Sequence, residues 1–398
     1  MIILYYIFFS ALSFGKEVPV SVLMDMAESY SHRIKAESFS IKAHESSLHQ
    51  SRLIANPLFS FQGGSLKSGE QRGPIMDLSL SQPFPWPGKR KTRIEFQDFA
   101  LTLSKFEKME VDLQVRHRIY VLSAELAALQ ELESHYAERK RRFGLIEKSL
   151  RSRPLASPKQ QVDRDLIESQ INLLEKGMID LVARKEALSW EIKIFSNLDF
   201  DRVLFSWDSL PEVLKKEEFI QLVVNSPRYK KLLIQSEMAQ NKINEARFEA
   251  RPDILLGVNY RQENVTPVNH FYHGMVSVVI PIIDHGQHSV EAARAEKRRT
   301  DAIRSFENDQ ILSLIHQAFS EYEGSKKALE VFRLKNLSSL ENKFLEAEKS
   351  FRKGFIDALT FLQIDSQVHE NIDQIYLSRV SYVNAVSQLH LLIGKGPQ

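Results

Sequence analysis

Apolar residues recur at helical spacing over unusually long parts of the chain. Through residues 89–153 they follow one another every three or four positions, with a single glycine and no proline. This spacing is typical of a coiled-coil seam, and about 65 helical residues make a rod roughly 100 Å long. Residues 287–353 repeat the pattern, and segments 167–195 and 368–393 carry it further. The sequence therefore predicts two long helices, each followed by a returning helix.

Two shorter stretches alternate apolar and polar residues instead. They are "IMDLSLSQ" from residue 75 and "DILLGVNY" from residue 253. A period of two is typical of strands with one apolar and one polar face. With the polar, breaker-rich turns beside them, these stretches predict β-hairpins at 58–83 and 253–281.

The same order of features occurs twice along the chain. Helical stretches at 19–54 and 213–249 each end before a proline, since the residue before proline disfavours the helical conformation. A hairpin, a long helix and a returning helix follow in both halves. The sequence therefore predicts two structural repeats, residues 16–200 and 201–398.

The N-terminus "MIILYYIFFSALSFG" is an apolar run that ends in small residues. It resembles a secretory signal, and we expect residues 1–15 to be removed after Gly15. The alternative is a buried N-terminal segment. Past residue 15 no run of 18 apolar residues follows, so no transmembrane helix is predicted.

The number of strands indicates how the chain would sit in a membrane. Four strands cannot close a barrel, whereas three chains supply twelve, within the range of outer-membrane barrels. In lipid only a closed barrel leaves no unpaired edge. The predicted fold is mainly α with a small β part: a trimeric 12-stranded transmembrane β-barrel, four strands per chain, continuing into a long α-helical barrel of coiled-coil hairpins. The predicted lipid-facing residues are Met76, Leu78, Leu80, Ile254, Leu256, Val258 and Tyr260.

The stretch "SQPFPWPGKRKTR" from residue 81 lies between a predicted strand and a long helix. Its three prolines and Gly88 would mark the conversion of sheet to helix at the membrane surface. Phe84 and Trp86 suit an aromatic belt there, and Lys89 and its basic neighbours would meet water or head groups. The alternative is a soluble loop around a packed tryptophan.

Composition excludes several classes of protein. The net charge is +2 with both signs well mixed, which argues against a nucleic-acid footprint. There are no cysteines, so disulfides, thiol chemistry, cysteine-ligated zinc and a lipid on cysteine are excluded. No metalloprotease, nucleophile-elbow, P-loop or dinucleotide motif occurs, so we predict no enzyme and no cofactor. Asp284, His285 and His288 have metal-ligand chemistry, but their place just after a strand favours a linker, and no metal is predicted.

In these features the chain resembles the TolC-like outer-membrane factor family of tripartite efflux and type I secretion systems. The resemblance lies in "ANPLFSF" and "ARPDILLG" before the strands, "QPFPWPGKR" and "IPIIDHGQ" after them, and residues 351–394. It covers nearly all of the mature chain. "QPFPWPGKR" looks most like the heavy-metal efflux branch, and the lipidated cysteine that members often carry is missing.

The resemblance implies a homotrimeric channel in the bacterial outer membrane with a helical tube in the periplasm. Substrates would leave passively after delivery by an inner-membrane pump of the RND or ABC type and a periplasmic adaptor (membrane fusion) protein. The adaptor would dock where the long helices turn back. The implied docking residues are Arg151, Arg153, Pro154, Leu155, Ala156 and Ser157 in the first half, and Arg352, Lys353, Gly354 and Phe355 in the second.

The first turn has Pro154 where the second has Gly354, so the two docking sites need not be alike. In a trimer, Asp357 and Asp365 would form rings of carboxylates that attract cations at the periplasmic aperture. The alternative for Asp357 is a helix cap, which the helix dipole favours. An alternative for the whole chain is a soluble coiled-coil scaffold that binds other proteins; it would be extractable without detergent.

Overall fold

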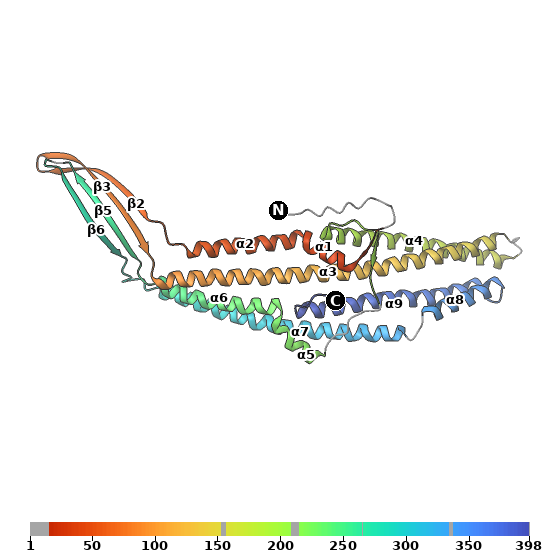
Figure 1. Ribbon diagram of the computed structural model, residues 1–398. Coiled ribbons are helices and arrows are strands. Elements are labelled where there is room, and N and C mark those ends of the chain that lie inside the picture. The colour runs from red at the N-terminus through yellow and green to blue at the C-terminus, as the bar shows by residue number, and fades with distance from the viewer. Residues whose placement is uncertain (1–15, 153–156, 208–214, 265, 334–336, 398) are drawn as a thin grey trace, which may run out of the picture. The chain divides into compact units, whose positions relative to one another are not determined.

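A computed structural model describes residues 16–152, 157–207, 215–264, 266–333 and 337–397 (Figure 1). The chain divides into two compact units, each built from separated parts of the sequence. The helical unit comprises Met1–Lys35, Glu110–Ser226 and Ile311–Gln398. The strand unit comprises Ala36–Met109 and Pro227–Gln310. The predicted signal, residues 1–15, lies outside the described residues.

Long helices dominate the described chain. The helices are α1 (Val20–Tyr30), α2 (His32–Arg52), α3 (Pro87–Arg151), α4 (Pro158–Ser196), α5 (Lys216–Leu222), α6 (Pro227–Glu249), α7 (Gln287–Arg333), α8 (Leu337–Arg352) and α9 (Ala358–Leu392), with a 3₁₀ turn at Val223–Asn225. The strands are β1 (Glu17–Pro19), β2 (Leu58–Ser68), β3 (Gln71–Phe84), β4 (Arg202–Leu204), β5 (Ile254–Glu263) and β6 (Asn269–Val278). None of these helices has the length and apolar character needed to cross a membrane.

The first predicted long helix matches α3, a single helix of 65 residues that α4 follows. The second, predicted for 287–353, corresponds to α7 and α8; residues 334–336 between them lie outside the described part. Helix, hairpin, long helix and returning helix occur in the same order in both halves. The boundary between repeats at residue 200 stays a prediction.

The two opening helices are not continuous, contrary to the sequence prediction. In the second half Ser226 is extended, with φ −65° and ψ 147°, and α6 begins at Pro227. The proline ring disfavours the helical conformation at the residue before it and suits the first helical position. In the first half Ser31, with ψ 120°, separates α1 from α2. The period of apolar residues does not reveal either break.

The strand unit holds a four-stranded antiparallel sheet in the order β2-β3-β5-β6. Two hairpins form it, β2 with β3 and β5 with β6, and β3 joins β5 between them. At one end of the sheet Phe84 of β3 lies opposite Ile254 of β5, which in turn lies opposite Val278. All four strands meet their helices at this end.

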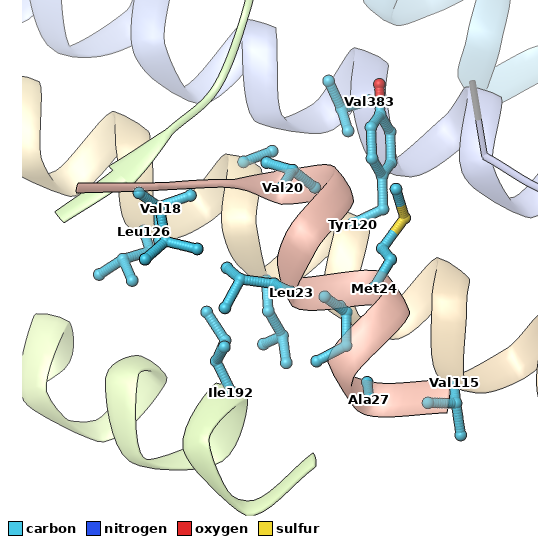
Figure 2. Packing of buried hydrophobic residues seen from close by; sticks show 14 of the residues in the cluster. Val18, Val20, Leu23, Met24, Ala27, Val115, Tyr120, Leu126, Ile192 and Val383 are labelled. Atoms are coloured by element: carbon cyan, nitrogen blue, oxygen red, sulfur yellow. The ribbon is translucent and has the colours of Figure 1, made fainter. Parts of the chain in front are cut away.

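The helical unit has an apolar core around α1 (Figure 2). Leu23 and Ala27 of α1 are fully buried and pack with Leu126 of α3 and Ile192 of α4. Full burial of one such leucine or isoleucine contributes about 1.5–3 kcal/mol. A short parallel pair of strands, β1 with β4, places Val18 and Val203 in the same core, although the pattern of the sequence did not predict these strands.

A second core of the helical unit joins α3, α4, α8 and α9. Phe361 of α9 lies at its centre, with ring centroids 5.6 Å from Phe143, 5.8 Å from Phe344 and 5.1 Å from Phe351. Phe143 and Phe361 are fully buried. Since α3 and α4 come from one helical hairpin and α8 and α9 from another, this core fixes the two hairpins to each other.

Candidate functional site

One face of the sheet is apolar and exposed. Residues opposite one another in an antiparallel ladder lie on the same face. Leu78 is opposite Tyr260, Leu80 is opposite Val258, and Met76 lies two residues before Leu78 on the same strand. Ile254 and Leu256 belong to the same alternating set as Val258. All seven residues predicted to face lipid therefore share one face of the sheet, although their contact with lipid stays a prediction.

Apolar residues of the two outer strands extend this face beyond the prediction. Phe59 and Phe61 of β2 lie opposite Leu80 and Leu78. Tyr272, Val276 and Val278 of β6 lie opposite Tyr260, Leu256 and Ile254. Four of these five side chains are more than half exposed: Phe59 67%, Phe61 61%, Tyr272 78% and Val276 71%. We call the whole set the apolar sheet face.

The other face of the sheet is polar along its middle. The hydroxyls of Ser60 and Ser79 share a hydrogen bond of 2.6 Å. Asp77 lies 3.4 Å from the guanidinium of Arg261, which lies opposite it on β5. Polar cross-strand pairs of this kind stabilise a face that meets water. The sheet thus has one apolar face and one face that is polar along its middle.

Ion pairs and hydrogen bonds connect the stretch between β3 and α3 to neighbouring segments, and Lys89 is not placed as the sequence predicted. Lys89 is buried, with its ammonium 3.0 Å from Asp253 and 3.5 Å from Glu249, so it does not meet water or head groups. The backbone N–H of Trp86 also donates to Asp253, at 3.0 Å. Arg90 donates to the carbonyl of Arg52, at 2.6 Å. Trp86 itself is 38% exposed.

Gly88 allows α3 to begin close against α6. A Cβ added at this position would lie 2.2 Å from the ring of Phe248, well inside any allowed contact. Side chains larger than hydrogen would push the two helix ends apart. The glycine that the sequence marked as the end of the sheet therefore has a packing role.

The turn after α8 is closed by a glycine cap. The N–H of Gly354 donates to the carbonyl of Phe351, and the N–H of Phe355 donates to that of Ser350, both at 2.9 Å. This pair of bonds is the Schellman motif, with Gly354 in the left-handed conformation at φ +76°. The turn leaves Phe355 76% exposed. An exposed aromatic side chain at a rigid turn suits a protein contact, as the docking prediction requires.

The turn before α4 lies largely outside the described residues, which omit 153–156 and with them Arg153, Pro154, Leu155 and Ala156. Ser157 caps α4, since its hydroxyl accepts from the N–H of Gln160. Arg151 at the end of α3 pairs with Glu147 at 2.6 Å. At the end of α8, Arg352 pairs with Glu348 at 2.7 Å, and Lys353 is exposed. The last residues of α3 and α8, Arg151 and Arg352, are thus both basic and exposed.

The structure brings the starts of α4 and α9 together. The backbone N–H of Ala358 donates to the carboxylate of Asp163 at 3.3 Å. Asp357 caps α9, because its carboxylate accepts from the N–H of Thr360 at 2.8 Å. Hydrogen bonding by the side chain of Thr360, and next by its backbone N–H, holds the pKa of Asp357 below its usual value. The hydrogen bond to Thr360 supports the helix-cap alternative for Asp357, and the residue is partly exposed.

Asp365, which was predicted to join a ring of carboxylates at the periplasmic aperture, lies in the interior of the helical unit. Its carboxylate is fully buried and pairs with the guanidinium of Arg139, which is itself buried. The ring of His369 lies 2.9 Å away. A carboxylate enclosed in this way by α3 and α9 holds helices together, so its placement favours a structural ion pair over an exposed ring.

His135 extends this buried cluster. Its Nε2 faces Nδ1 of His369, and their ring centroids are 4.6 Å apart. Burial, and next the positive charges of His369, Arg139 and Arg142, lower the pKa of His135 from 6.5 to about 4, although Asp365 opposes the shift. In the folded chain His135 is therefore neutral at pH values where the unfolded chain would protonate it.

We expect acid to destabilise the helical unit through His135. The unfolded state binds this proton below pH 6.5 and the folded state only below about pH 4, so stability falls between these values and then levels off. His135→Gln should lose less stability than the wild type between pH 7 and pH 4.5, measured by denaturant unfolding at each pH. His49→Gln, at an exposed histidine of α2, should follow the wild type; a His135→Gln profile equal to the wild type's would contradict the argument.

The residues with metal-ligand chemistry have other contacts. Asp284 accepts from the N–H of Gly286 at 2.8 Å. Nδ1 of His288 lies 3.9 Å from Glu291, one turn along α7. In the parts of the chain that the structure describes, no three histidines or carboxylates are grouped to hold a metal ion.

Comparison with known proteins identifies the fold. No protein-family model matches the sequence, and no curated protein matches it. Among solved structures, the chain is similar to CusC, with a TM-score of 0.79 and 13% identity over 95% of this chain and 92% of the other. It is similar to the open state of the MtrE outer membrane channel of Neisseria gonorrhoeae, with a TM-score of 0.78 and 12% identity over 95% and 89%. It is also similar to the outer membrane protein VceC of Vibrio cholerae, with a TM-score of 0.76 and 11% identity over 95% and 97%.

These likenesses extend over almost the whole length of each chain. The chain therefore has the fold of the TolC-like outer-membrane channels, as the sequence predicted. At this level of identity the likeness shows the fold alone; function needs its own argument.

Proposed function

We propose that the chain is the outer-membrane channel subunit of a tripartite efflux system. Three copies form a 12-stranded barrel in the bacterial outer membrane, continued by a helical tube in the periplasm. Substrates delivered by an inner-membrane RND or ABC pump and a periplasmic adaptor leave through it passively. The channel's relatives in fold support the proposal, since MtrE and the Campylobacter jejuni protein CmeC are outer membrane channels.

The observation that carries the proposal is the apolar sheet face. It is broad, exposed and backed by a polar face, and within the described residues β2 and β6 each have one strand neighbour. An exposed apolar sheet with two free edges would aggregate in water. Closure with further copies in lipid removes both problems, because every strand edge is then paired and the apolar sheet face meets hydrocarbon.

Cell fractionation tests the proposal. We expect the chain in the outer-membrane fraction, released by detergent as a trimer that heating converts to monomer. A soluble coiled-coil scaffold would instead remain in the aqueous fraction without detergent, and that result would contradict the channel.

The helix turns are the proposed docking site for the adaptor. We expect Gly354→Ala to cost about 1–2 kcal/mol, because φ +76° is unfavourable for any side chain with a Cβ. Export should fall while trimers remain in the membrane. Gly324→Ala is the matched control: no atom lies within 4 Å of its added Cβ, and in mid-helix alanine is favoured by about 1 kcal/mol. Loss of trimers in Gly354→Ala would show that the turn supports assembly rather than docking.

We propose that Asp357 supplies the ring of carboxylates at the periplasmic aperture. Asp365 is left out of this proposal because it is buried against Arg139. Asparagine caps a helix about as well as aspartate, so Asp357→Asn keeps the cap and removes the charge. We expect the variant to retain its thermal stability and to lose cation preference in single-channel recordings. Unchanged selectivity would leave Asp357 with the cap alone.

A further inference from the structure

Four short segments connect the sheet of the strand unit to its helices: 53–57, 85–86, 250–253 and 279–286. We call them the crossing segments. Their contacts place them side by side in the same order as the strands. Gln82, near the second segment, donates to the carbonyl of Ala55 in the first at 2.7 Å. Trp86 joins the second to Asp253 of the third, and Gly286 of the fourth packs against Ala250 of the third.

The two outer crossing segments are apolar and exposed. Leu53 and Ile54 of the first are 60% and 62% exposed. The fourth exposes its apolar side chains further: Val279 76%, Ile280 72%, Ile282 75% and Ile283 89%. The charged contacts of Lys89 and Asp253 lie between them, at the inner segments. Concentrated exposed apolar residues mark a contact surface rather than ordinary solvent-facing loop.

Strand direction brings these two surfaces together when the sheet closes. Each pairing from β2 to β6 is antiparallel, so β2 and β6 run in opposite directions. Hence β6 of one copy can pair antiparallel with β2 of the next. Since β6 ends at Val278 and β2 begins at Leu58 at the same end of the sheet, residues 279–283 would then lie beside residues 53–57 of the neighbour.

A proline stands at each of these edges and limits the strand pairing. Pro57 directly precedes β2, and Pro281 follows β6 by three residues. Proline has no backbone N–H to donate, so a ladder cannot run on through either position. Past the last strand hydrogen bond, side chains must provide the contact between copies, and here both edges present large aliphatic ones.

We propose that these outer crossing segments form a joint between copies of this chain: Val279, Ile280, Ile282 and Ile283 of one copy pack against Leu53 and Ile54 of the next. The inference rests on the proposed function, because it needs a closed barrel. Beyond the proposed trimer, the inference names the residues of one contact between neighbouring copies. This contact would close the barrel at the level where the strands end and the helices begin.

The absence of cysteine from the chain makes the joint directly testable. Ile54→Cys combined with Ile282→Cys places one thiol on each side of the joint. The purified protein in detergent is treated with a short thiol-specific bismaleimide and run on a denaturing gel. We expect most of the chain to migrate as covalent dimers and trimers. Each single variant should remain monomeric on the same gel.

The matched control moves the second thiol to the far end of the sheet. Glu70 lies in the turn between β2 and β3, beyond the 11 residues of β2. At about 3.3 Å per residue this places it roughly 35 Å from the crossing segments, out of the reagent's reach. Ile54→Cys with Glu70→Cys should therefore give no covalent oligomer.

The outcomes separate the joint from the function on which it rests. The mass of the unmodified wild type in detergent reports assembly independently of any cysteine. If the wild type and the Ile54→Cys/Ile282→Cys variant are both trimeric but the variant does not crosslink, the joint is wrong and the proposed channel is unaffected. The apolar residues 279–283 would then face lipid. A monomeric wild type would overturn both.

Discussion

Replacing Arg139 with methionine is expected to lower the free energy of unfolding by about 3–5 kcal/mol, the usual cost of leaving one partner of a buried ion pair alone. Asp365 would keep its place, fully buried between α3 and α9, and lose its main counter-charge. The ring of His369 could not replace the bidentate guanidinium, which reaches both carboxylate oxygens. Denaturant unfolding of the purified protein measures the effect.

Two further variants show whether burial is the cause. Arg139→Met with Asp365→Leu removes both charges and should recover most of the lost stability, since apolar residues often replace a buried pair without cost. Lys140→Met breaks the neighbouring exposed pair with Glu175, whose side chains are 37% and 55% exposed, and should cost at most about 1 kcal/mol. An equal loss in Lys140→Met and Arg139→Met would contradict the argument.

The second large effect is expected on the apolar sheet face. Arginine at a lipid-facing position near the middle of the membrane costs about 2–4 kcal/mol. Leu78→Arg should therefore reduce the yield and thermal stability of trimers assembled in lipid, because Leu78 lies on the face formed with Phe61 and Tyr260. Ser79→Arg, on the polar face beside Ser60, is the matched control and should assemble nearly as the wild type does. If the two variants assemble equally well, the assignment of the faces is wrong.

The apolar sheet face could be predicted in its centre and not at its edges. Within residues 76–81 of β3 and 256–261 of β5, large apolar residues alternate with polar residues or glycine, so a period of two assigns the face directly. In β2 the alternation stops at Gly63 and Gly64, and in β6 Phe271 and Met275 place apolar residues on the other face as well. There only the pairing register shows which side each residue takes.

The role of Asp365 could not be predicted, because its partner is distant in the sequence. Arg139 lies 226 residues away on another helix. The local pattern around Asp365 fits an exposed position on a helix as well as a buried one. Burial of charge depends on which helices pack together, and a single sequence does not report that. The break at Ser226 differs, since Pro227 was a local signal that the apolar period obscured.

The helical turn at Gly354 was predicted from resemblance, and its physical reason is now visible. The positive φ of this cap, with its two backbone hydrogen bonds, strongly favours a residue without a Cβ. The first half has Pro154 at the corresponding place in the sequence, outside the described residues, and a proline ring, which holds φ near −65°, does not allow the left-handed conformation that Gly354 takes. The two turns therefore differ in backbone chemistry, and an adaptor that docks at both would meet two different surfaces.

Ion conductance in a planar lipid bilayer shows directly whether this chain forms a channel. Purified trimers added to one side should produce discrete, stepwise increases in current, each from one inserted channel. The Leu78→Arg variant should give far fewer insertions than Ser79→Arg. Folded wild-type protein that inserts into the bilayer without any conductance, or never inserts, would contradict the proposed channel.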